Sequence, residues 1–245
     1  MTIHSTAIVS EKALIGENVT IGAFTIVYDN VQIGANTVIE AFCEIGIQTK
    51  LSNGKSLIIG KSSHIRSHSI FYEASNFGEG LVTGHRVSVR EKTIAGKALQ
   101  IGTLSDIQGD CIIGDYVRFH SNVHIGKMSV IGNFVWIFPY VVLTNDPHPP
   151  SDTLMGVKVK DFAVIATMTV ILPGAVIEKG VLIGAHSSVK GNTEEDTVYA
   201  GSPAKKICKT SKIKLLDGSD APAYPWREHF KRGYPDSVTK LWSEE

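Results

Sequence analysis

The 245-residue sequence has little leucine, few cysteines and no net charge. Its three cysteines are far apart and make neither a disulfide framework nor a zinc motif. Lys+Arg and Asp+Glu both total 24, which argues against a broad surface for nucleic acid or an anionic membrane. No apolar run approaches the roughly 18–20 residues that span a bilayer, and Met1–His4 does not begin a signal peptide. We therefore expect a soluble, reduced, cytoplasmic protein.

β-Branched residues take the place of leucine. The chain contains 27 Ile and 23 Val but only 13 Leu. Branched side chains are restricted at χ1 and suit a pleated backbone better than a helix. Charged residues make up 20% of the chain, below the ~25% typical of globular proteins. These features argue against a long helical bundle and predict an all-β protein.

Apolar residues recur every six positions along most of the chain. The repeat runs in three blocks, from Ile3 to Ile45, from Ile59 to Leu143 and from Val159 to Val189. Of its 29 anchor positions, 24 are Ile, Leu or Val, and 13 are followed directly by Gly. Neither an amphipathic helix nor a simple hairpin has this period. A short strand and a corner do, so we expect about ten triangular coils of three hexads each, stacked through parallel strands.

The stretch Ile15-Gly-Glu-Asn-Val-Thr-Ile-Gly-Ala resembles the hexapeptide-repeat acyltransferase superfamily, and the chain as a whole is most like bacterial nucleotide-sugar N-acyltransferases. The resemblance covers about residues 3–208 and implies a left-handed parallel β-helix. We assign residues 1–208 to this domain. Residues 209–245 form a C-terminal extension that is expected to hold one short helix. It either covers the last coil or a neighbouring subunit, or is a solvated tail with one anchoring aromatic cluster.

The six-residue period breaks twice inside the repeat domain. The first break, near residues 46–58, shifts the phase by two residues and reads as a small turn insertion. The second, near residues 144–158, contains three prolines within four residues, which cannot continue a hydrogen-bonded ladder. Binding and catalytic residues often collect on loops that leave a rigid scaffold. The second break is therefore the expected position of a functional loop.

This loop carries the candidate catalytic residue. The segment 142–149 is similar to the loop that carries the catalytic histidine in galactoside, maltose and related hexapeptide acetyltransferases, which implies that His148 is a general base. A histidine with a pKa near the working pH can take the proton that an amine or hydroxyl loses as it attacks a thioester. Asp146 could orient the imidazole and is grouped with the acceptor-binding residues. The alternative is that His148 is an ordinary loop residue.

Three further residues are expected to bind the acceptor. The segment 119–123 resembles the family's Phe-x-x-Asn strand, whose asparagine helps to bind acceptor, and this implies that role for Asn122. His85 and Glu91 lie where polar residues crowd and the apolar anchors weaken. They are six residues apart, so they occupy equivalent corners on adjacent faces of one coil. We expect them to form an acceptor-binding wall; a solvated charged face is the alternative.

The resemblance also implies acetyl-CoA or another acyl-CoA as co-substrate. In the family's acetyltransferases, backbone amides beside small residues hold the pantetheine, and the matching positions are Thr167 and Ala185. The segment 198–205 resembles the family's Gly-x-Pro-Ala-(Lys/Arg) tail, and Lys205 fits an attraction to the nucleotide phosphates. Lys190 is adjacent to the position at which the family often has a lysine.

Three other sets of residues lie outside the expected catalytic site. His120 and His124 are separated by three residues, whereas the paired ligands of hexapeptide-repeat carbonic anhydrases are separated by four, so we expect no metal. Cys43 and Cys111 fall on the small position of their hexads and should be buried. Trp136 falls on an outward position and needs cover, for which a partner subunit is a candidate.

The resemblance to this superfamily implies a homotrimeric, acyl-CoA-dependent acyltransferase. Its expected reaction is acylation of the amino group of a nucleotide-linked amino-deoxysugar in surface polysaccharide synthesis, with donor and acceptor meeting between two subunits. The sequence leaves other functions open: O-acetyl transfer to a sugar or small hydroxyl acceptor, a γ-type carbonic anhydrase, and a noncatalytic β-helix scaffold.

Overall fold

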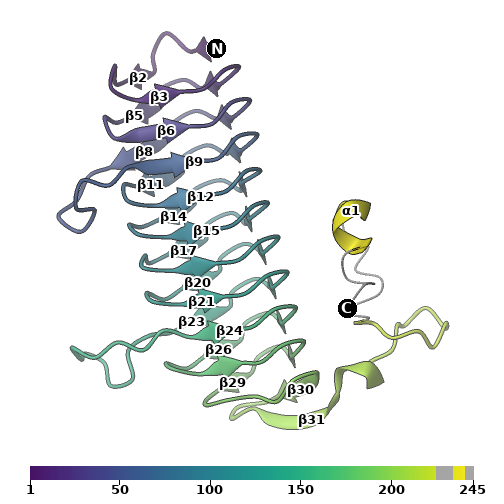
Figure 1. The fold of residues 1–245 in the computed structure, drawn as a ribbon. Coiled ribbons are helices and arrows are strands. Elements are labelled where there is room, and N and C mark those ends of the chain that lie inside the picture. Colours follow the sequence, from purple (N-terminus) through teal and green to yellow (C-terminus); the bar gives the residue numbers. More distant parts are fainter. Residues whose placement is uncertain (225–233, 241–245) are drawn as a thin grey trace.

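The chain winds into a long three-sided prism (Figure 1). The computed structural model describes residues 1–224 and 234–240. Most strands are two residues long, and neighbours within a sheet are parallel and usually 18 residues apart, as when Gln100 pairs with Val82 on one side and Arg118 on the other. The all-β prediction and the left-handed parallel β-helix are thus confirmed.

Three sheets form the three faces of the prism. The first sheet contains β1 Thr2–Ile3, β4 Thr20–Ile21, β7 Val38–Ile39, β10 His64–Ile65, β13 Val82–Thr83, β16 Gln100–Ile101, β19 Arg118–Phe119, β22 Trp136–Ile137, β25 Val164–Ile165, β28 Leu182–Ile183, β30 Thr197–Ala200 and β31 Lys205–Lys209. The second contains β2 Ile8–Val9, β5 Ile26–Val27, β8 Glu44–Ile47, β11 Ile70–Tyr72, β14 Ser88–Val89, β17 Asp106–Ile107, β20 His124–Ile125, β23 Val142–Leu143, β26 Val170–Ile171 and β29 Ser188–Val189. The third contains β3 Leu14–Ile15, β6 Val31–Ile33, β9 Leu57–Ile59, β12 Asn76–Phe77, β15 Ile94–Ala95, β18 Ile112–Ile113, β21 Val130–Ile131, β24 Lys158–Val159 and β27 Val176–Ile177.

The six-residue anchors fill the inside of the prism. In a typical strand the first residue faces outward and the second is buried: Gln100 is exposed, whereas Ile101 is only 2% exposed. The resulting core is continuous from Val19 to Val189. Cys43 and Cys111 occupy the small inward positions and are fully buried, as predicted.

Corners explain why glycine follows so many anchors. The residues that turn each corner in the left-handed backbone region are mostly not glycine; examples are Asn18, Phe24 and Asn36, with φ of 55°, 56° and 59°. A glycine directly after an anchor instead permits close stacking of coils. A Cβ at Gly22 would lie 2.6 Å from the backbone nitrogen of Ala41 in the next coil. Crowding between coils, more than unusual dihedral angles, therefore accounts for these glycines.

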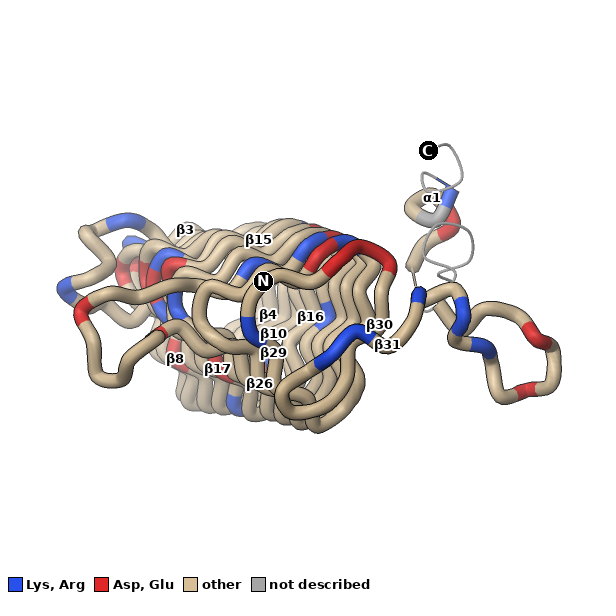
Figure 2. Tube along the Cα trace, turned by 90° about the horizontal axis from the view of Figure 1, so that it is seen from below, with Lys and Arg blue, Asp and Glu red and all other residues tan. Residues whose placement is uncertain are grey.

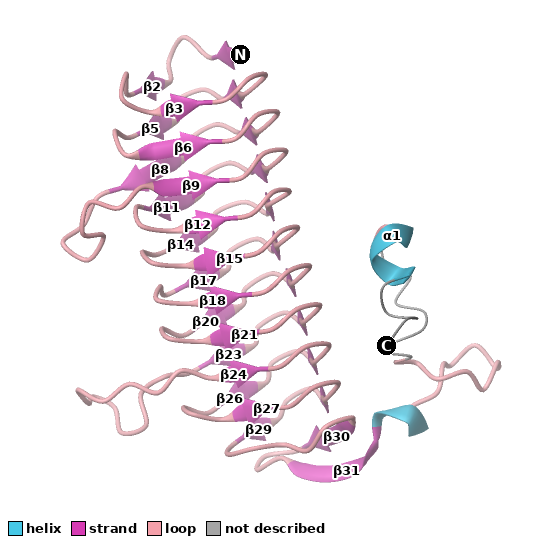
Figure 3. Ribbon diagram, viewed as in Figure 1, coloured by secondary structure: helices cyan, strands magenta, loops and turns pink. Residues whose placement is uncertain are grey.

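Two loops leave the prism at the same corner, between the second and third sheets (Figure 3). One connects β8 to β9, and the other connects β23 to β24. Both loops project from the same edge of the molecule, and the other turns along that edge are much shorter. This corner therefore carries His148, on the second loop.

The C-terminal extension packs back on the first sheet. After the antiparallel pair of β30 and β31 come a short 3₁₀ turn, η1 (Thr210–Lys212), and a single helical turn, α1 (Asp236–Thr239). Tyr234 and Val238 cover Trp136, whose Nε1 donates a hydrogen bond to the Tyr234 hydroxyl. The cover that we expected from a partner subunit thus comes from this chain itself. The segment 225–233, which includes much of the region where we expected a helix, lies outside the described residues.

Charged residues of both signs lie mainly at the corners and loops of the prism (Figure 2). Among the described residues, no helix has the length and apolar character needed to cross a membrane.

Candidate functional site

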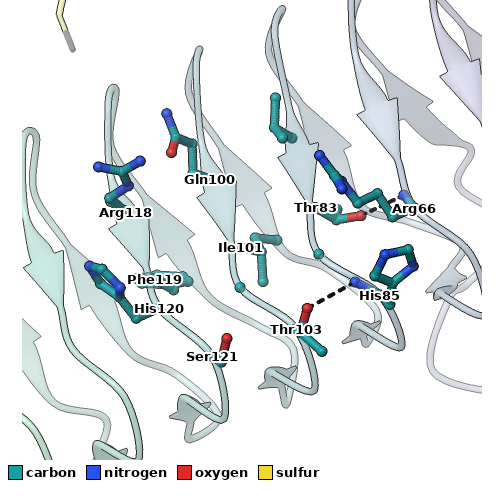
Figure 4. A pocket seen from close by; sticks show the side chains of 13 residues that line it. Arg66, Thr83, His85, Gln100, Ile101, Thr103, Arg118, Phe119, His120 and Ser121 are labelled. Carbon is teal, nitrogen blue, oxygen red and sulfur yellow. Dashed lines mark hydrogen bonds between the residues drawn. The ribbon is translucent and has the colours of Figure 1, made fainter.

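A groove of about 330 Å³ crosses the first sheet near its corner with the second (Figure 4). It runs over β13, β16 and β19. Its floor is low because Gly84 and Gly102 have no side chain at a position where the preceding and following coils carry Arg66 and His120. Both ends of the groove carry an arginine. We call the end at Arg66 and His85 the cationic end, and the end at Arg118 and His120, which lie against aromatic rings, the aromatic end.

At the cationic end, hydrogen bonds fix the position of His85. Its Nδ1 lies 2.9 Å from the Ser67 hydroxyl, with which it shares a hydrogen bond, and its backbone N–H donates to the Thr103 hydroxyl over 3.2 Å. Glu40 accepts a hydrogen bond from the Ser67 backbone N–H (3.1 Å) and lies 2.8 Å from Nε2 of His64. The imidazole of His85 is thus oriented through one nitrogen, which leaves the other for a ligand.

Glu40 lies beside this end of the groove, one coil before Arg66. Burial favours its protonated form, but hydrogen bonds with His64 and the Ser67 N–H outweigh burial and hold the pKa of Glu40 below its ordinary value. Its oxygen lies 4.0 Å from Nδ1 of His85. Glu40 is therefore ionised at neutral pH and engaged by the polar groups around it.

At the other end, Arg118 and His120 lie against aromatic rings. The Arg118 guanidinium lies 4.9 Å from the ring centroid of Trp136, and the imidazole of His120 stacks on Phe138 at 4.5 Å. Burial, and then the positive charge of Arg118, lower the pKa of His120 below its ordinary value of 6.5. Nε2 of His120 is buried and has no hydrogen-bond partner among the described residues. The imidazole is therefore neutral at pH 7.

His148 is exposed on its loop, at a different corner from the groove. Asp146 accepts hydrogen bonds from the His148 backbone N–H (3.0 Å) and from the hydroxyl and backbone N–H of Ser151 (2.6 and 2.9 Å). The hydrogen bond from the Ser151 hydroxyl is the main cause that lowers the pKa of Asp146. The Asp146 carboxylate therefore holds the loop by accepting hydrogen bonds from His148 and Ser151. It binds the backbone of His148 and not, as expected, its imidazole.

The loop returns to the prism through Gly156, which permits no side chain. A Cβ there would overlap the carbonyl oxygen of Met128. We expect Gly156→Ala to displace the loop and to lower the stability by about 1–3 kcal/mol, because the added methyl group cannot fit without moving the backbone. The Tm measures this effect. Asp152→Ala, an exposed change in the same loop, is the control; wild-type values for Gly156→Ala would contradict the prediction.

The expected wall of His85 and Glu91 is not formed. His85 begins the corner after the first sheet, whereas Glu91 begins the corner after the second, where it is only 4% exposed. Glu91 binds Arg90 (3.0 Å) and the hydroxyl of Thr49, and these hydrogen bonds outweigh burial and lower the pKa of Glu91. It anchors the first inserted loop, a contact that six-residue spacing alone could not predict.

The remaining candidates divide between the groove and other surfaces. Asn122 directly follows Ser121 of the groove and turns the corner with φ 58°. Thr167 and Ala185 stack in the same corner column as His85, Thr103 and Ser121: the His186 N–H donates to the Thr167 carbonyl, and the Met168 and Tyr140 N–H groups donate to the carbonyls of Pro139 and Ser121. Lys190 follows β29 and Lys205 begins β31, and both are exposed.

Of the titratable residues that line the groove, the sequence pointed to His85 but not to Arg66, Arg118 or His120. Writing the sequence in coils of 18 would have placed Arg118 and His120 one coil beyond Gln100 and Gly102. Arg66 lies one coil before Gly84 in the same register. His120 and His124, considered together for a metal, belong to different sheets, since His120 follows β19 and His124 lies in β20.

The second sheet carries an aspartate–histidine pair that the sequence did not single out. His124 Nδ1 lies 3.2 Å from Asp106. Burial opposes the charge of Asp106, but hydrogen bonds with His124 and Gln108 outweigh it and lower its pKa. A lowered carboxyl pKa stabilises the fold at pH values above the unfolded pKa, and that stability is lost as the pH falls through the lowered value.

We therefore expect Asp106→Asn to reduce the free energy of unfolding by about 1 kcal/mol at pH 7. The difference from wild type should shrink below pH 4 and vanish below the folded pKa of Asp106. Chemical denaturation at several pH values measures this. Glu79→Gln removes an exposed ion pair with Lys61 and should change stability little at any pH. A pH-independent loss in Asp106→Asn would contradict the assignment.

Comparison with known proteins identifies the family. A profile described as "Bacterial transferase hexapeptide (six repeats)" matches residues 12–46. The acyl-[acyl-carrier-protein]–UDP-N-acetylglucosamine O-acyltransferase of Aliarcobacter butzleri is 34% identical over 95% of this chain and 85% of that protein. The dTDP-4-amino-4,6-dideoxy-D-glucose acyltransferase of Escherichia coli is 29% identical over 70% of this chain and 90% of that protein.

Two further matches agree with this fold. A protein of Escherichia coli named as a lipopolysaccharide biosynthesis O-acetyl transferase, WbbJ, is 34% identical over 40% of this chain, and the match spans 56% of that protein. The structure of Arabidopsis UDP-N-acetylglucosamine acyltransferase superposes with a TM-score of 0.62 over 84% of this chain and 74% of its own, at 16% identity, which shows the shared fold. The prism and its repeats define a hexapeptide-repeat transferase. The chain belongs to the hexapeptide-repeat acyltransferase family.

Proposed function

We propose that this protein transfers an acyl group from acyl-CoA to the amino group of a nucleotide-linked amino-deoxysugar, in the synthesis of a surface polysaccharide. One observation carries the proposal: the groove and the column of Thr167 and Ala185 share one corner of the prism, so an acceptor and a pantetheine arm can lie end to end. The match to the dTDP-amino-sugar acyltransferase over 90% of that relative supports the choice of acceptor.

The donor lies along the later coils. The backbone N–H groups of Thr167 and Ala185 themselves bind the pantetheine, because the amides on either side of each already donate to a neighbouring coil. The exposed Lys190 and Lys205 attract the nucleotide phosphates as point charges. The acyl-carrier-protein named for one relative presents the same kind of thioester. We favour acetyl-CoA or another acyl-CoA and no metal.

His148 is the proposed general base. The amine nitrogen attacks the thioester carbonyl, the C–S bond breaks, and the proton that the amine loses passes through the imidazole to the departing thiolate. Backbone N–H groups at the corner can stabilise the oxyanion. Because His148 and the groove lie at different corners of one chain, the loop must reach the groove of a neighbouring copy, and we propose a homotrimer for this reason. Such an enzyme works in the cytoplasm, where nucleotide sugars and CoA are available.

O-acyl transfer is the second candidate. It is favoured by the names of two relatives, the UDP-N-acetylglucosamine O-acyltransferase and the O-acetyl transferase WbbJ. The groove itself does not distinguish a hydroxyl from an amine, because its polar side chains can donate and accept hydrogen bonds to either.

The test follows free thiol. The purified protein is incubated with acetyl-CoA and with amino sugars, nucleotide-linked amino sugars or sugars with hydroxyl groups only. Treatment of the product with alkaline hydroxylamine separates the candidates, since it cleaves an ester and leaves an amide. We expect thiol release with the nucleotide-linked amino sugar and a resistant product. Thiol release with none of the acceptors would overturn the proposal, and a labile product would favour O-transfer.

A further inference from the structure

The groove is elongated, and its two ends differ in chemistry. Three coil spacings separate Arg66, which follows β10, from Arg118 in β19, so the arginines mark a length of roughly 14 Å along the prism. The end at His120 and Ser121 meets the column that leads to Thr167 and Ala185. The end at Arg66 points away from that column, toward the N-terminal coils (Figure 4).

We infer that the Arg66 end of the groove binds the diphosphate of a nucleotide-linked acceptor. This rests on the proposed function, because the reacting amine must lie at the end nearest the thioester. The anionic part of the acceptor then extends in the opposite direction, along the bare backbone of Gly84 and Gly102, and reaches Arg66.

Arg66 is suited to this role by its surroundings. Its backbone N–H donates to the Thr83 hydroxyl over 2.9 Å, and its exposed side chain leans across Thr83 toward the groove (Figure 4). Within the part of the chain that the structure describes, no carboxylate lies within ion-pair distance of its guanidinium. Glu40, one coil away in the same column, is already engaged by His64 and the Ser67 N–H. The guanidinium is therefore available for two parallel hydrogen bonds to phosphate oxygens.

His85 adds a second donor at the same end. When Nδ1 of His85 accepts a hydrogen bond from the Ser67 hydroxyl, Nε2 carries the ring hydrogen and can donate a hydrogen bond to a phosphate oxygen. Because Gly84 and Gly102 have no side chains, a ligand can lie close to their backbone along the floor of the groove. Arg118 is less available, because its guanidinium lies over Trp136.

Binding without turnover tests the inference. Calorimetric titration with thymidine diphosphate, uridine diphosphate and inorganic pyrophosphate is carried out on the full chain and on Arg66→Gln, Arg66→Lys and Arg86→Gln. Arg86 is the matched control: it is exposed on the next coil but turns the corner, outside the residues that line the groove. We expect Arg66→Gln to weaken binding of at least one nucleoside diphosphate about ten- to a hundredfold. Arg66→Lys should fall between, and Arg86→Gln should match wild type.

Steady-state kinetics adds an independent readout. Arg66→Gln should raise the KM for the nucleotide-linked acceptor while the KM for acetyl-CoA and the Tm stay at wild-type values. The inference fails if no probe binds the wild-type protein, or if Arg66→Gln and Arg86→Gln bind equally well. Diphosphate binding that depends on Arg66 but is accompanied by no acyl transfer would sink the proposed reaction and leave this site standing. Acyl transfer whose KM for the acceptor does not change in Arg66→Gln would support the proposed reaction and overturn this diphosphate site.

Discussion

Replacing His148 with alanine should reduce kcat by about 10²–10⁴-fold, the usual contribution of a positioned general base. The side chain is exposed on its loop, and the hydrogen bond that His148 makes within the described residues is from its backbone N–H to Asp146. The variant should therefore keep the wild-type Tm and the wild-type affinity for acetyl-CoA. Thiol release at saturating concentrations of both substrates, over a range of pH, is the measurement.

Two controls make the result specific. His4→Ala removes another exposed histidine, in the first coil, and should leave kcat unchanged. Mixed oligomers assembled from His148→Ala chains and Arg66→Gln chains are assayed at an acceptor concentration well below the KM of Arg66→Gln, where neither variant alone is active. They should recover part of the activity if the loop acts on a neighbour's groove. Activity of His148→Ala within tenfold of wild type would exclude this residue as the base and direct attention to His120, whose imidazole is neutral in the groove at pH 7.

The fold could be predicted because every hexad has the same pattern of inward-facing and small residues. An anchor such as Ile101 faces inward and is buried, a small residue such as Cys111 fills the space beside it, and the next coil repeats the arrangement 18 residues later. Each coil contacts mainly its neighbours, so local sequence determines the structure with little help from distant residues. The period says nothing about handedness, which came from the resemblance to a family.

The site was harder to predict because it depends on stacking between coils. The sequence suggested that Glu91 contacts the acceptor. In the structure Thr49 of the first inserted loop donates a hydrogen bond to the Glu91 carboxylate, which is buried and holds that loop. The groove arises from two glycines between Arg66 and His120, a feature that extends over four coils and is invisible within one hexad. Asp146 was chosen for its closeness to His148 in sequence, and such closeness does not determine which atom of a neighbour it binds.

The C-terminal extension shows the same limit at longer range. Trp136 and Tyr234 are 98 residues apart, and no periodic pattern links them. An outward tryptophan predicts a cover but not its source. Tyr116, Phe134 and Phe162 form a ladder of stacked rings along one corner, and Tyr234 packs edge-on against two of them. This aromatic ladder is a platform for the extension.

Phe119→Ala should destabilise the protein by about 3–5 kcal/mol and lower its Tm by roughly 10 °C. Phe119 is among the largest fully buried side chains, and its strand pairs through Ile101 on one side and Ile137 on the other. The cavity left by the ring removes contacts to both neighbouring coils, and in a stack of short coils such contacts between neighbours supply most of the stability.

The same change should also affect the groove, because Phe119 lies beneath it between Arg118 and His120. Amides of β16, β19 and β22 should lose protection from hydrogen exchange before those of the first coils, and the KM for acceptor should rise even at temperatures where the chain stays folded. Phe24→Ala, at a corner where the ring is 56% exposed, is the matched control and should cost less than about 1 kcal/mol. Equal losses from the two variants would mean that stability resides in the corners, and the stacked inward side chains would no longer explain why this sequence folds as a prism.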